Sequence, residues 1–483
     1  MCKITLLKNF LFSVGFSAFI AAPLLAQDSL IPLEDLKPLD VGEGLINKHS
    51  FQYGLSAANT YINDSIYLKK GYFLGNYRPY FRYMLNEKHI FNTRGKTSYK
   101  YNHSLTDAQI NAGTTPSTGE YAMELFNAEF NFAQHKIMMG RSFYRLGRGL
   151  LFANFADGAE YNGQFRYAMV KVMASYSAQY SGCALSVQGC GLSGQIAQKG
   201  TYDVVPGRAL DVNLPDAGKR VFAAAEIHSP QYFGSSMYAL ALYSKDLNTA
   251  KNAKNEIYTF DPLYTGLGLS GFIVTPHLRY LTEFIYEMGS TYNRVFANVS
   301  EKTDVRAWAI TADINYSLPW LEGLLKPGLV VQYAAGSGRS GKVGSDSNPA
   351  LPAQENESGA DNNFFYFGAY SAGLALKPKL SNLHIIRGGF QMRPLNHFYW
   401  GRNLMLSAKY SYYHKQNADY VISDPNAKVA KANVGQGLDF QFVYDFRTDL
   451  KFFYTYGLFL PGPAYLTSAE NIHIHILSIN LLF

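Results

Sequence analysis

The chain has 483 residues and a net charge of +7, and Asp, Glu, Lys and Arg together make only 16% of it. This positive charge is small and dispersed, which excludes the clustered basic patch of a nucleic-acid-binding protein. Tyr (37), Phe (33) and Gly (42) are abundant, and this composition favours a long β protein over an α/β enzyme.

The N-terminal segment has the pattern of an export signal. Lys3 and Lys8 precede the apolar stretch FLFSVGFSAFIAAPLLA, which ends at Ala26 before the polar QDS. The stretch is short and is interrupted by serines and a proline, so a cleavable signal is favoured over a membrane anchor. We therefore expect residues 1–26 to be a signal peptide and residues 27–48 to be a periplasmic lead-in.

From about residue 49 the hydrophobic pattern alternates with a period of two, in segments of the roughly 9 to 11 residues that a tilted transmembrane strand needs. In LDFQFVYDF, residues 438–446, apolar side chains share one face and Asp439, Gln441 and Asp445 share the other. A soluble β-sandwich would bury the apolar face and would rarely need strands this long. A membrane barrel instead turns the apolar face to lipid and the polar face to a watery lumen. No later run of about 18 apolar residues offers a membrane-spanning helix. The sequence thus predicts an all-β fold, a transmembrane antiparallel β-barrel of the porin type over residues 49–483.

Nineteen stretches carry the strand pattern, with a turn predicted at Asn162 and Gly163. Bacterial single-chain barrels have an even number of strands, so one of the stretches is wrong. Short and long connections fall out of phase between residues 363 and 413, and we place the error there. We expect eighteen strands, with sixteen or twenty as alternatives. The stretches are 49–58, 78–85, 88–101, 120–133, 135–142, 157–162, 164–180, 218–228, 234–245, 264–275, 277–288, 304–315, 325–335, 363–376, 383–393, 402–413, 435–446, 449–459 and 471–483.

Two long connections, residues 181–217 and the Gly/Ser-rich 336–362, are expected to be extracellular loops. The first contains Cys183 and Cys190, separated by ALSVQG. In an exported protein this pair is expected to form a disulfide, with two free thiols as the alternative. The spacing is poor for zinc, and no histidine lies nearby.

Basic side chains share one face of two consecutive predicted strands. On a lipid face each charge would cost about 2 to 4 kcal/mol near the midplane, so we expect these side chains to form a basic stripe in the lumen. The stripe is either a track for anionic solutes or only a means of keeping the lumen hydrated. Its members are Arg78, Arg82, Lys88, Arg94, Lys96 and Lys100.

Acidic side chains are expected on lumenal faces elsewhere in the barrel: Glu283, Glu287, Asp439 and Asp445. If they oppose the basic stripe, a transverse field across the channel is an alternative to a simple preference for anions.

Residues 140–163, GRSFYRLGRGLLFANFADGAEYNG, break the alternation between two strands. Their aromatic content is higher than an ordinary external loop would need. We expect the part near 143–157 to fold inward as a constriction, with aromatic rings on the wall and charges around the opening. A surface loop is the alternative. The charged residues assigned to this constriction are Arg141, Arg145, Arg148, Asp157 and Glu160.

The chain ends on IHIHILSINLLF, in which alternate apolar residues form one face up to Phe483. This face is expected to contact lipid at the barrel seam. A C-terminal aromatic residue resembles the signal by which the barrel assembly machinery recognises outer-membrane barrels. His473 and His475 share a strand face, but two ligands make a weak metal site, so we expect them to line a polar wall without a metal. If the intervening isoleucines faced lipid, a bulge near Ile476 would be needed.

The stretch GRSFYRLGRGLLFANFADGAEY, with the export signal and the terminal Phe, resembles the Hof group of outer-membrane proteins from Helicobacter and its relatives. The Gly-Arg strand end before an inward loop is more distantly similar to OprD-like substrate-specific porins. The resemblance implies a porin-type barrel in the bacterial outer membrane and places Gly140, Arg141, Arg148 and Gly149 where the loop begins. The cysteine loop and the acidic lumenal positions depart from the OprD pattern, so no substrate is carried over.

These observations predict a porin for passive diffusion of small hydrophilic solutes, anions among them, and no cofactor. A surface adhesin or ligand-binding barrel acting through residues 181–217 and 336–362 is the alternative. A membrane-embedded hydrolase is disfavoured, because the sequence offers no recognisable nucleophile constellation. The expected partners are outer-membrane lipid, the assembly machinery and the solutes, in a monomer or homotrimer.

Overall fold

The computed structural model describes residues 50–64, 70–86, 88–102, 117–177, 220–247, 260–274, 276–295, 299–321, 323–338, 360–399, 401–420, 422–424, 426–447 and 449–482. Most of the described chain is β-strand. The alternation of apolar and polar residues suits a sheet with lipid on one face and an aqueous lumen on the other. The strands are β1 (Ser50–Asp64), β2 (Lys70–Asn86), β3 (His89–Asn102), β4 (Ser117–Phe132), β5 (His135–Leu146), β6 (Phe152–Gln164), β7 (Met169–Ser177), β8 (Arg220–His228), β9 (Ser235–Asp246), β10 (Phe260–Val274), β11 (Leu278–Val295), β12 (Val299–Ser317), β13 (Gly328–Gly336), β14 (Ala360–Asp361), β15 (Leu383–Met392), β16 (Leu404–Lys415), β17 (Asn433–Arg447), β18 (Leu450–Pro461) and β19 (Ile472–Leu482), with a 3-10 turn, η3 (Pro319–Leu321).

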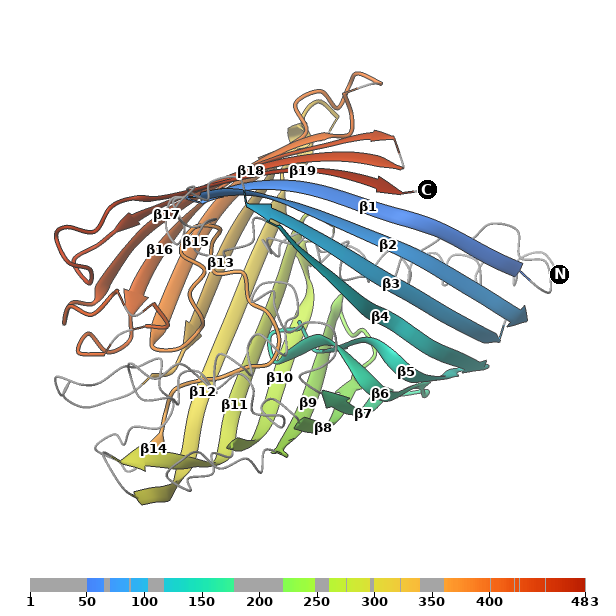
Figure 1. Ribbon diagram of the computed structural model, residues 1–483, viewed down its shortest axis with the longest axis horizontal. Helices are drawn as coiled ribbons and strands as arrows, with labels where there is room; N and C mark the ends of the chain where they lie inside the picture. The colour runs from blue at the N-terminus through green and yellow to red at the C-terminus, as the bar shows by residue number, and fades with distance from the viewer. Residues whose placement is uncertain are drawn as a thin grey trace.

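The strands form one sheet that closes on itself, since β1 pairs with both β2 and β19 (Figure 1). Eighteen long strands pair antiparallel with their neighbours and make the wall of the barrel. The two-residue β14 lies beside β12 in a parallel pairing and is not part of the antiparallel wall. The predicted antiparallel barrel of eighteen strands is therefore confirmed.

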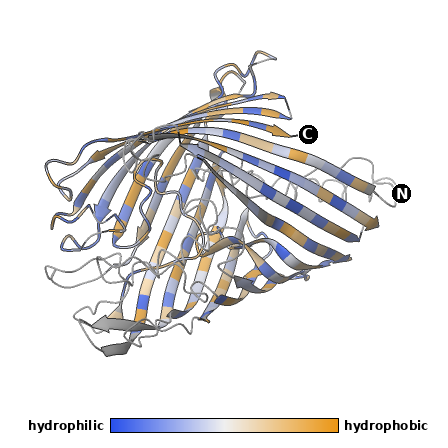
Figure 2. Cartoon of the chain, viewed as in Figure 1, coloured by the Kyte–Doolittle hydropathy of each residue, from blue (hydrophilic) through white to orange (hydrophobic). Residues whose placement is uncertain are grey.

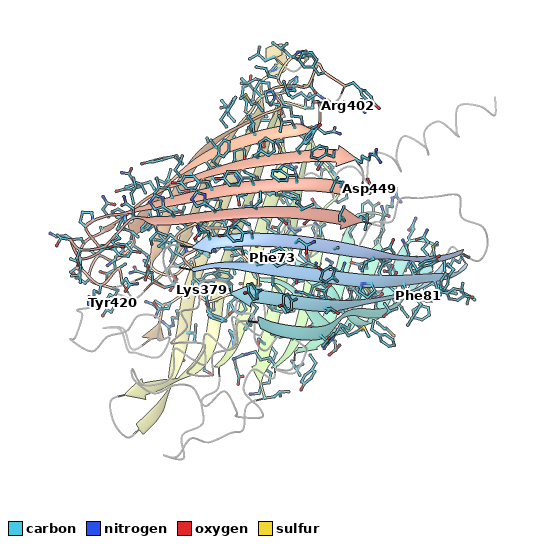
Figure 3. The ribbon with its side chains drawn as sticks, turned by 45° about the horizontal axis from the view of Figure 1, so that its top comes forward. Phe73, Phe81, Lys379, Arg402, Tyr420 and Asp449 are labelled. Carbon is cyan, nitrogen blue, oxygen red and sulfur yellow. The ribbon has the colours of Figure 1, made fainter. Side chains whose placement is uncertain are left out.

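The two faces of the wall differ in polarity, and hydrophobic and hydrophilic residues alternate along the strands (Figure 2). On β2, Phe73 and Phe81 share one face (Figure 3), whereas Arg78 on the other face is buried. On β17, Leu438 is 42% exposed while Asp439 next to it is buried. The apolar faces thus point outward toward lipid and the polar faces point into the barrel, as the sequence predicted.

One predicted strand, 363–376, is wrong, and it lies in the interval where the error was expected. The structure has no wall strand between β13 and β15, which pair directly with each other. Residues 363–376 instead run inside the barrel, where most of their side chains are buried (Figure 1). Residues 364–367 form a continuous aromatic run, FFYF, and residues 363–368 are all buried, so other protein groups cover this segment on both sides.

The turn predicted at Asn162 and Gly163 is also wrong. Both residues pair with β5 inside β6, and the chain turns at residues 165–168, where the amide of Phe165 donates to the carbonyl of Ala168. The predicted short strand 157–162 is the second half of the longer β6.

The histidines of β19 lie on the outer face. Ile474 and Ile476 are buried inside the barrel, whereas Leu477 and Ile479, on the same face as the histidines, are exposed. The Nδ1 atom of His473 hydrogen-bonds the hydroxyl of Tyr456 at 2.9 Å, and that of His475 the hydroxyl of Tyr454 at 3.1 Å. The register between β18 and β19 is continuous, so no bulge is needed, and the expected polar lumenal wall is corrected to an outward-facing His and Tyr pattern.

Several expectations fall outside the described residues: the signal peptide and lead-in before residue 49, the pair Cys183 and Cys190, and the terminal Phe483. Of the loop 336–362 only the two ends are described. In the part of the chain that is described, no helix is both long enough and apolar enough to cross a bilayer.

Candidate functional site

The β5–β6 hairpin leaves the barrel wall halfway along its length. Strand β5 pairs with β4 only as far as Arg141, and β6 pairs with β7 only from Asp157 onward. Between these points the two strands leave the wall sheet and pair with each other, apart from a bridge between Phe152 and Phe367. The free end of the hairpin turns away from the wall into the barrel (Figure 1).

Two glycines face each other where the hairpin bends, since Gly140 on β5 pairs with Gly158 on β6. Gly140 has a φ of +112°, and a Cβ there would lie 2.3 Å from the carbonyl oxygen of Phe126. A Cβ on Gly158 would lie equally close to the carbonyl oxygen of Ala174. Only residues without a side chain allow both neighbouring strands to approach this closely.

At the base of the hairpin, Arg141 and Asp157 bind each other. The Nε of Arg141 donates to Oδ1 of Asp157 at 2.8 Å and its Nη2 to Oδ2 at 2.6 Å, while its Nη1 donates to the carbonyl of Met123 at 3.2 Å. Both side chains belong to the face that carries the exposed Met139. The pair therefore joins the departing hairpin to the edge of β4, away from the hairpin tip.

The tip of the hairpin reaches the opposite part of the wall. The amide of Gly147 donates to Oε2 of Glu226 on β8 at 3.0 Å, and the amide of Arg148 donates to Oε2 of Glu283 on β11 at 2.9 Å. The guanidinium of Arg148 donates to Oγ1 of Thr311 at 2.8 Å and forms an ion pair with Asp313, both on β12. Nearer its base, Phe155 lies 5.8 Å below the guanidinium of Arg94 on β3. The hairpin thus spans the lumen from β3 to β12.

A second inward segment, residues 362–382, meets the hairpin inside the barrel. The amides of Phe367, Gly368 and Ala369 donate to the carbonyls of Leu151, Leu150 and Gly149 at 2.9 to 3.1 Å. The side-chain amide of Asn154 also donates to the carbonyl of Phe367. The two segments are therefore joined by backbone hydrogen bonds, as in a short sheet.

Aromatic rings pack at this junction. Phe367 contacts Phe222 of the wall at a ring distance of 4.9 Å, and Phe222 contacts Phe152 at the same distance. Burial raises the pKa of the Tyr366 hydroxyl, which therefore stays neutral. The junction of the two inward segments is therefore a packed aromatic cluster.

Three of the four predicted acidic residues hold these segments. Besides Glu283, Oε2 of Glu287 accepts the amide of Phe365 at 2.8 Å, and the carboxylate of Asp439 accepts the amide of Leu374 at 3.2 and 3.3 Å. The fourth, Asp445, lies near the β17–β18 turn, opposite Lys451 in the strand register. The acidic lumenal side chains thus bind backbone donors in addition to lining the interior.

The basic stripe has its own carboxylate, which the sequence analysis missed. The Nε atoms of Arg78 and Arg94 lie 3.0 and 2.9 Å from Oε2 of Glu124, and Nζ of Lys96 lies 3.9 Å from Oε1. A β-bulge between β3 and β4 at Arg94 places Glu124 there. The sequence did contain a sign of this contact. Glu124 follows the two basic strands and lies at a position where the alternation points into the lumen.

The other members of the stripe are more dispersed. Arg82 lies on the same face of β2, and Lys88 lies in the turn before β3. Lys100 is near the far end of β3, and its side chain is outside the description. Of the predicted constriction, Glu160 is buried on β6 and accepts from the side-chain amide of Asn162 at 2.6 Å. The predicted constriction residues are thus divided between the base of the hairpin and its tip.

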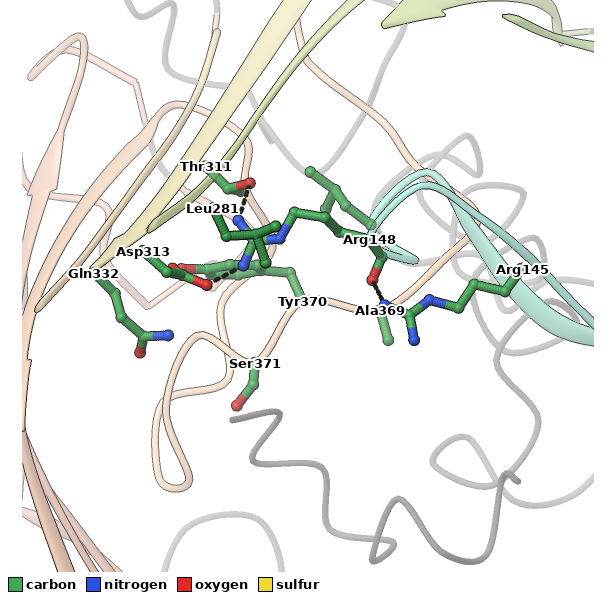
Figure 4. A pocket seen from close by; sticks show the side chains of 10 residues that line it. Arg145, Arg148, Leu281, Thr311, Asp313, Gln332, Ala369, Tyr370 and Ser371 are labelled. Carbon is green, nitrogen blue, oxygen red and sulfur yellow. Dashed lines mark hydrogen bonds and ion pairs between the residues drawn. The ribbon is translucent and has the colours of Figure 1, made fainter. Parts of the chain in front are cut away.

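A small pocket lies between the hairpin tip, the second segment and the wall (Figure 4). It offers about 50 Å³ to the centres of water-sized molecules, enough for a few ordered waters. Arg145 donates through Nη2 to the carbonyl of Arg148 at 2.6 Å, and its buried Nε has no hydrogen-bond partner among the described residues. The polar side chains that line the pocket are Arg145, Arg148, Thr311, Asp313, Gln332, Tyr370 and Ser371. Its arginines, hydroxyls and amide can donate hydrogen bonds to a polar or anionic group, whereas Asp313 can only accept them. Within the described ranges, no group of three His, Cys, Asp or Glu side chains is arranged to hold a metal ion.

The fold is shared with solved outer-membrane proteins. The chain is similar to OccK8 (OprE) of Pseudomonas aeruginosa, with a TM-score of 0.54 and 10% identity over 90% of this chain and 98% of that one. It is similar to OccAB4 of Acinetobacter baumannii, with a TM-score of 0.52 and 9% identity over 90% and 98% of the two chains. It is also similar to OpdK of Pseudomonas aeruginosa solved with vanillate, with a TM-score of 0.50 and 8% identity over the same shares.

No curated protein sequence matches the chain. Residues 220–473, more than half of the sequence, match the family described as alginate export. Together with the fold, this match places the protein among the porin-type β-barrels of the bacterial outer membrane. The chain belongs to the alginate export family.

Proposed function

We propose that the protein is a passive channel for small hydrophilic solutes, and that its narrowest part lies where the β5–β6 hairpin and residues 362–382 meet. The proposal depends on one observation: two segments tied to opposite parts of the wall cross the interior of a closed barrel whose inner face is charged. Such segments restrict the cross-section of a lumen and set what passes through it.

The charge balance favours a weak preference for anions. Three cationic side chains, Arg78, Arg94 and Lys96, share the single carboxylate of Glu124. At the tip, Arg145 adds a second cation beside the ion pair of Arg148 and Asp313. A lumen lined with an excess of one charge raises the local concentration of counter-ions.

The experiment is the reversal potential of the purified protein in a planar bilayer under a salt gradient. We expect stepwise currents and a reversal potential of the sign that shows a preference for anions. Lys96→Gln should move the potential toward cations, because it removes one lumenal charge. Arg306→Gln is the matched control, since the Arg306 side chain is 66% exposed on the outer face and pairs with Asp304. A protein that carries no current at any voltage contradicts the proposal.

Export of an acidic polysaccharide is the second candidate, because the matched family is described by alginate export. A polymer chain needs both inward segments to leave a continuous path, whereas small ions pass through a narrow opening. Oligouronates should then block the current more strongly than neutral oligosaccharides of the same length. Equal block by both would favour the first candidate.

Other parts of the proposal rest on the sequence alone. They are the resemblance to the Hof group of Helicobacter, export through residues 1–26, a periplasmic segment at 27–48, and assembly as a monomer or homotrimer. The disulfide of Cys183 and Cys190, and adhesion through the loops 181–217 and 336–362, are likewise proposals. Trimming these loops should leave conductance unchanged and should abolish host-cell binding if the adhesin alternative is right.

A further inference from the structure

The wall holds both inward segments by the same chemistry. A carboxylate on a wall strand accepts a backbone amide of the segment at Glu226 for Gly147, Glu283 for Arg148, Glu287 for Phe365 and Asp439 for Leu374. Each carboxylate is at most 6% exposed. Hydrogen bonds to a charged acceptor are roughly twice as strong as those to a neutral one. The position of the segments therefore depends on whether these carboxylates are charged.

Both described hydrogen bonds to the Glu283 carboxylate are made to one of its two oxygens. Its Oε2 accepts the amide of Arg148 and the hydroxyl of Tyr238 at 2.7 Å. Its Oε1 is buried and has no hydrogen-bond partner among the described residues. Arg145, Arg148 and Glu226 are the other charged groups that act on it. A proton added at Oε1 would remove a buried negative charge and would weaken the acceptor that holds Arg148.

Glu287 and Asp439 have both neutral and charged neighbours. Oε1 of Glu287 accepts the hydroxyl of Tyr264 at 3.2 Å. Asp439 lies opposite Lys409 in the register of β16 and β17, and close to the hydroxyl of Tyr413, on which Arg387 also acts. Both carboxylates hold backbone amides of the second segment.

Glu226 behaves differently, because His228 hydrogen-bonds its Oε1 and Lys171 acts on it from β7. Glu226 thus has a hydrogen-bond partner on Oε1, besides the amide of Gly147 on Oε2, and a positive charge nearby. Glu226 should therefore keep its hold on Gly147 under mildly acidic conditions. The response to acid depends on Glu283, Glu287 and Asp439.

We propose that the two inward segments form an acid-released gate, in which protonation of Glu283, Glu287 and Asp439 frees the amides of Arg148, Phe365 and Leu374. This inference rests on the proposed channel function and adds a regulation to it. At neutral pH these three carboxylates hold the segments to the wall, together with the ion pair of Arg148 and Asp313 and the hydrogen bond from Gly147 to Glu226. The segments loosen when the three carboxylates become neutral.

The test compares the wild type with a triple variant, Glu283→Gln, Glu287→Gln and Asp439→Asn, in planar bilayers. We expect the wild-type current per channel to rise about tenfold between about pH 7 and about pH 4, where carboxyl groups take up protons. The triple variant should conduct at the higher level at both pH values. Glu129→Gln is the matched control, because Glu129 is a lumenal carboxylate whose described partners, Lys136 and Asn92, both belong to the wall.

A second measurement separates this proposal from the channel function. Hydrogen exchange of the peptides that contain Arg148, Phe365 and Leu374, corrected for the intrinsic effect of pH, should speed up in acid in the wild type. This readout requires no current and no variant. Steady currents that do not change with pH, together with unchanged exchange, would overturn the gate while leaving the channel intact. A silent protein whose exchange still accelerates in acid would overturn the channel function instead.

Discussion

Arg148, at the tip of the β5–β6 hairpin, forms an ion pair with Asp313 on β12, 165 residues further along the chain. The side chain of Asp313 is 7% exposed, so this contact is largely sheltered from solvent. The base of the hairpin is continuous with the wall, where β5 pairs with β4 and β6 pairs with β7, so the hairpin is held at both ends and crosses the lumen as a bridge.

Removing this contact should open the constriction. In Arg148→Ala the buried carboxylate of Asp313 loses its cation, at a cost of about 3 kcal/mol to the closed arrangement. We expect a larger single-channel current and a reversal potential shifted toward cations. Arg306→Ala, which breaks an exposed pair with Asp304 at 3.3 Å, is the control and should change neither. An Arg148→Ala channel with wild-type current would show that the tip does not limit conduction.

The cation cluster at Glu124 should matter for stability more than for conduction. Glu124→Ala leaves Arg78 and Arg94, which are 3% and 2% exposed, without the carboxylate that they share. We expect a loss of about 3 to 5 kcal/mol in the free energy of unfolding, measured by urea titration in vesicles. Glu129→Ala removes a carboxylate whose partner Lys136 is 40% exposed, and it should cost less than about 1 kcal/mol. Equal losses in the two variants would contradict the assignment.

The bend of the hairpin should depend on Gly140. In Gly140→Ala the new Cβ would lie 2.3 Å from the carbonyl of Phe126 at a φ of +112°, so the strands must separate. The strain of about 1 to 3 kcal/mol should lower the folded fraction, seen as the compact band on an unheated gel. Gly388→Ala on β15 is the control, because a Cβ there meets nothing within 4 Å. The prediction fails if both variants fold equally well.

The outward orientation of the apolar faces can be tested by placing an arginine at two different depths in the membrane. Val331 is 54% exposed near the middle of β13, and Leu329 is 42% exposed close to its end. Val331→Arg should cost about 2 to 4 kcal/mol in unfolding free energy, whereas Leu329→Arg near the interface should cost about 0 to 1 kcal/mol. The comparison in vesicles needs no assumption about conduction. Two equal costs would argue against lipid on this face.

The sequence predicted the polarity of the wall because, within each strand, apolar and polar residues alternate between the face toward lipid and the face toward the lumen. Leu438 and Asp439 are neighbours, and a period of two places them on opposite faces whatever the rest of the chain does. The number of strands followed from the even count of closed barrels together with the phase of the connections. The error near residues 363–376 arose because the sequence shows an apolar stretch there but does not show that protein, and not lipid, covers it.

The hairpin was harder to place from sequence, although its aromatic residues and glycines marked residues 140–163 as unusual. The alternating pattern of a strand continues past Arg141 and Asp157, because β5 and β6 still pair with each other after they leave the wall. The sequence therefore does not show where the hairpin departs. The bend is encoded in a steric relation between Gly140 and the carbonyl of Phe126, which belongs to a different strand.

What the sequence by itself determined was local: which faces are apolar, which strands are basic and where the chain could not be an ordinary loop. Only the tertiary structure decided which donor meets which acceptor. Glu283 and Glu287 were assigned to the lumen from parity, but their partners are the amides of Arg148 and Phe365, which lie 135 and 78 residues away. The physical reason is that a backbone amide looks the same at every position in a sequence, and only the closed barrel with its two inward segments brings a particular amide to a particular carboxylate.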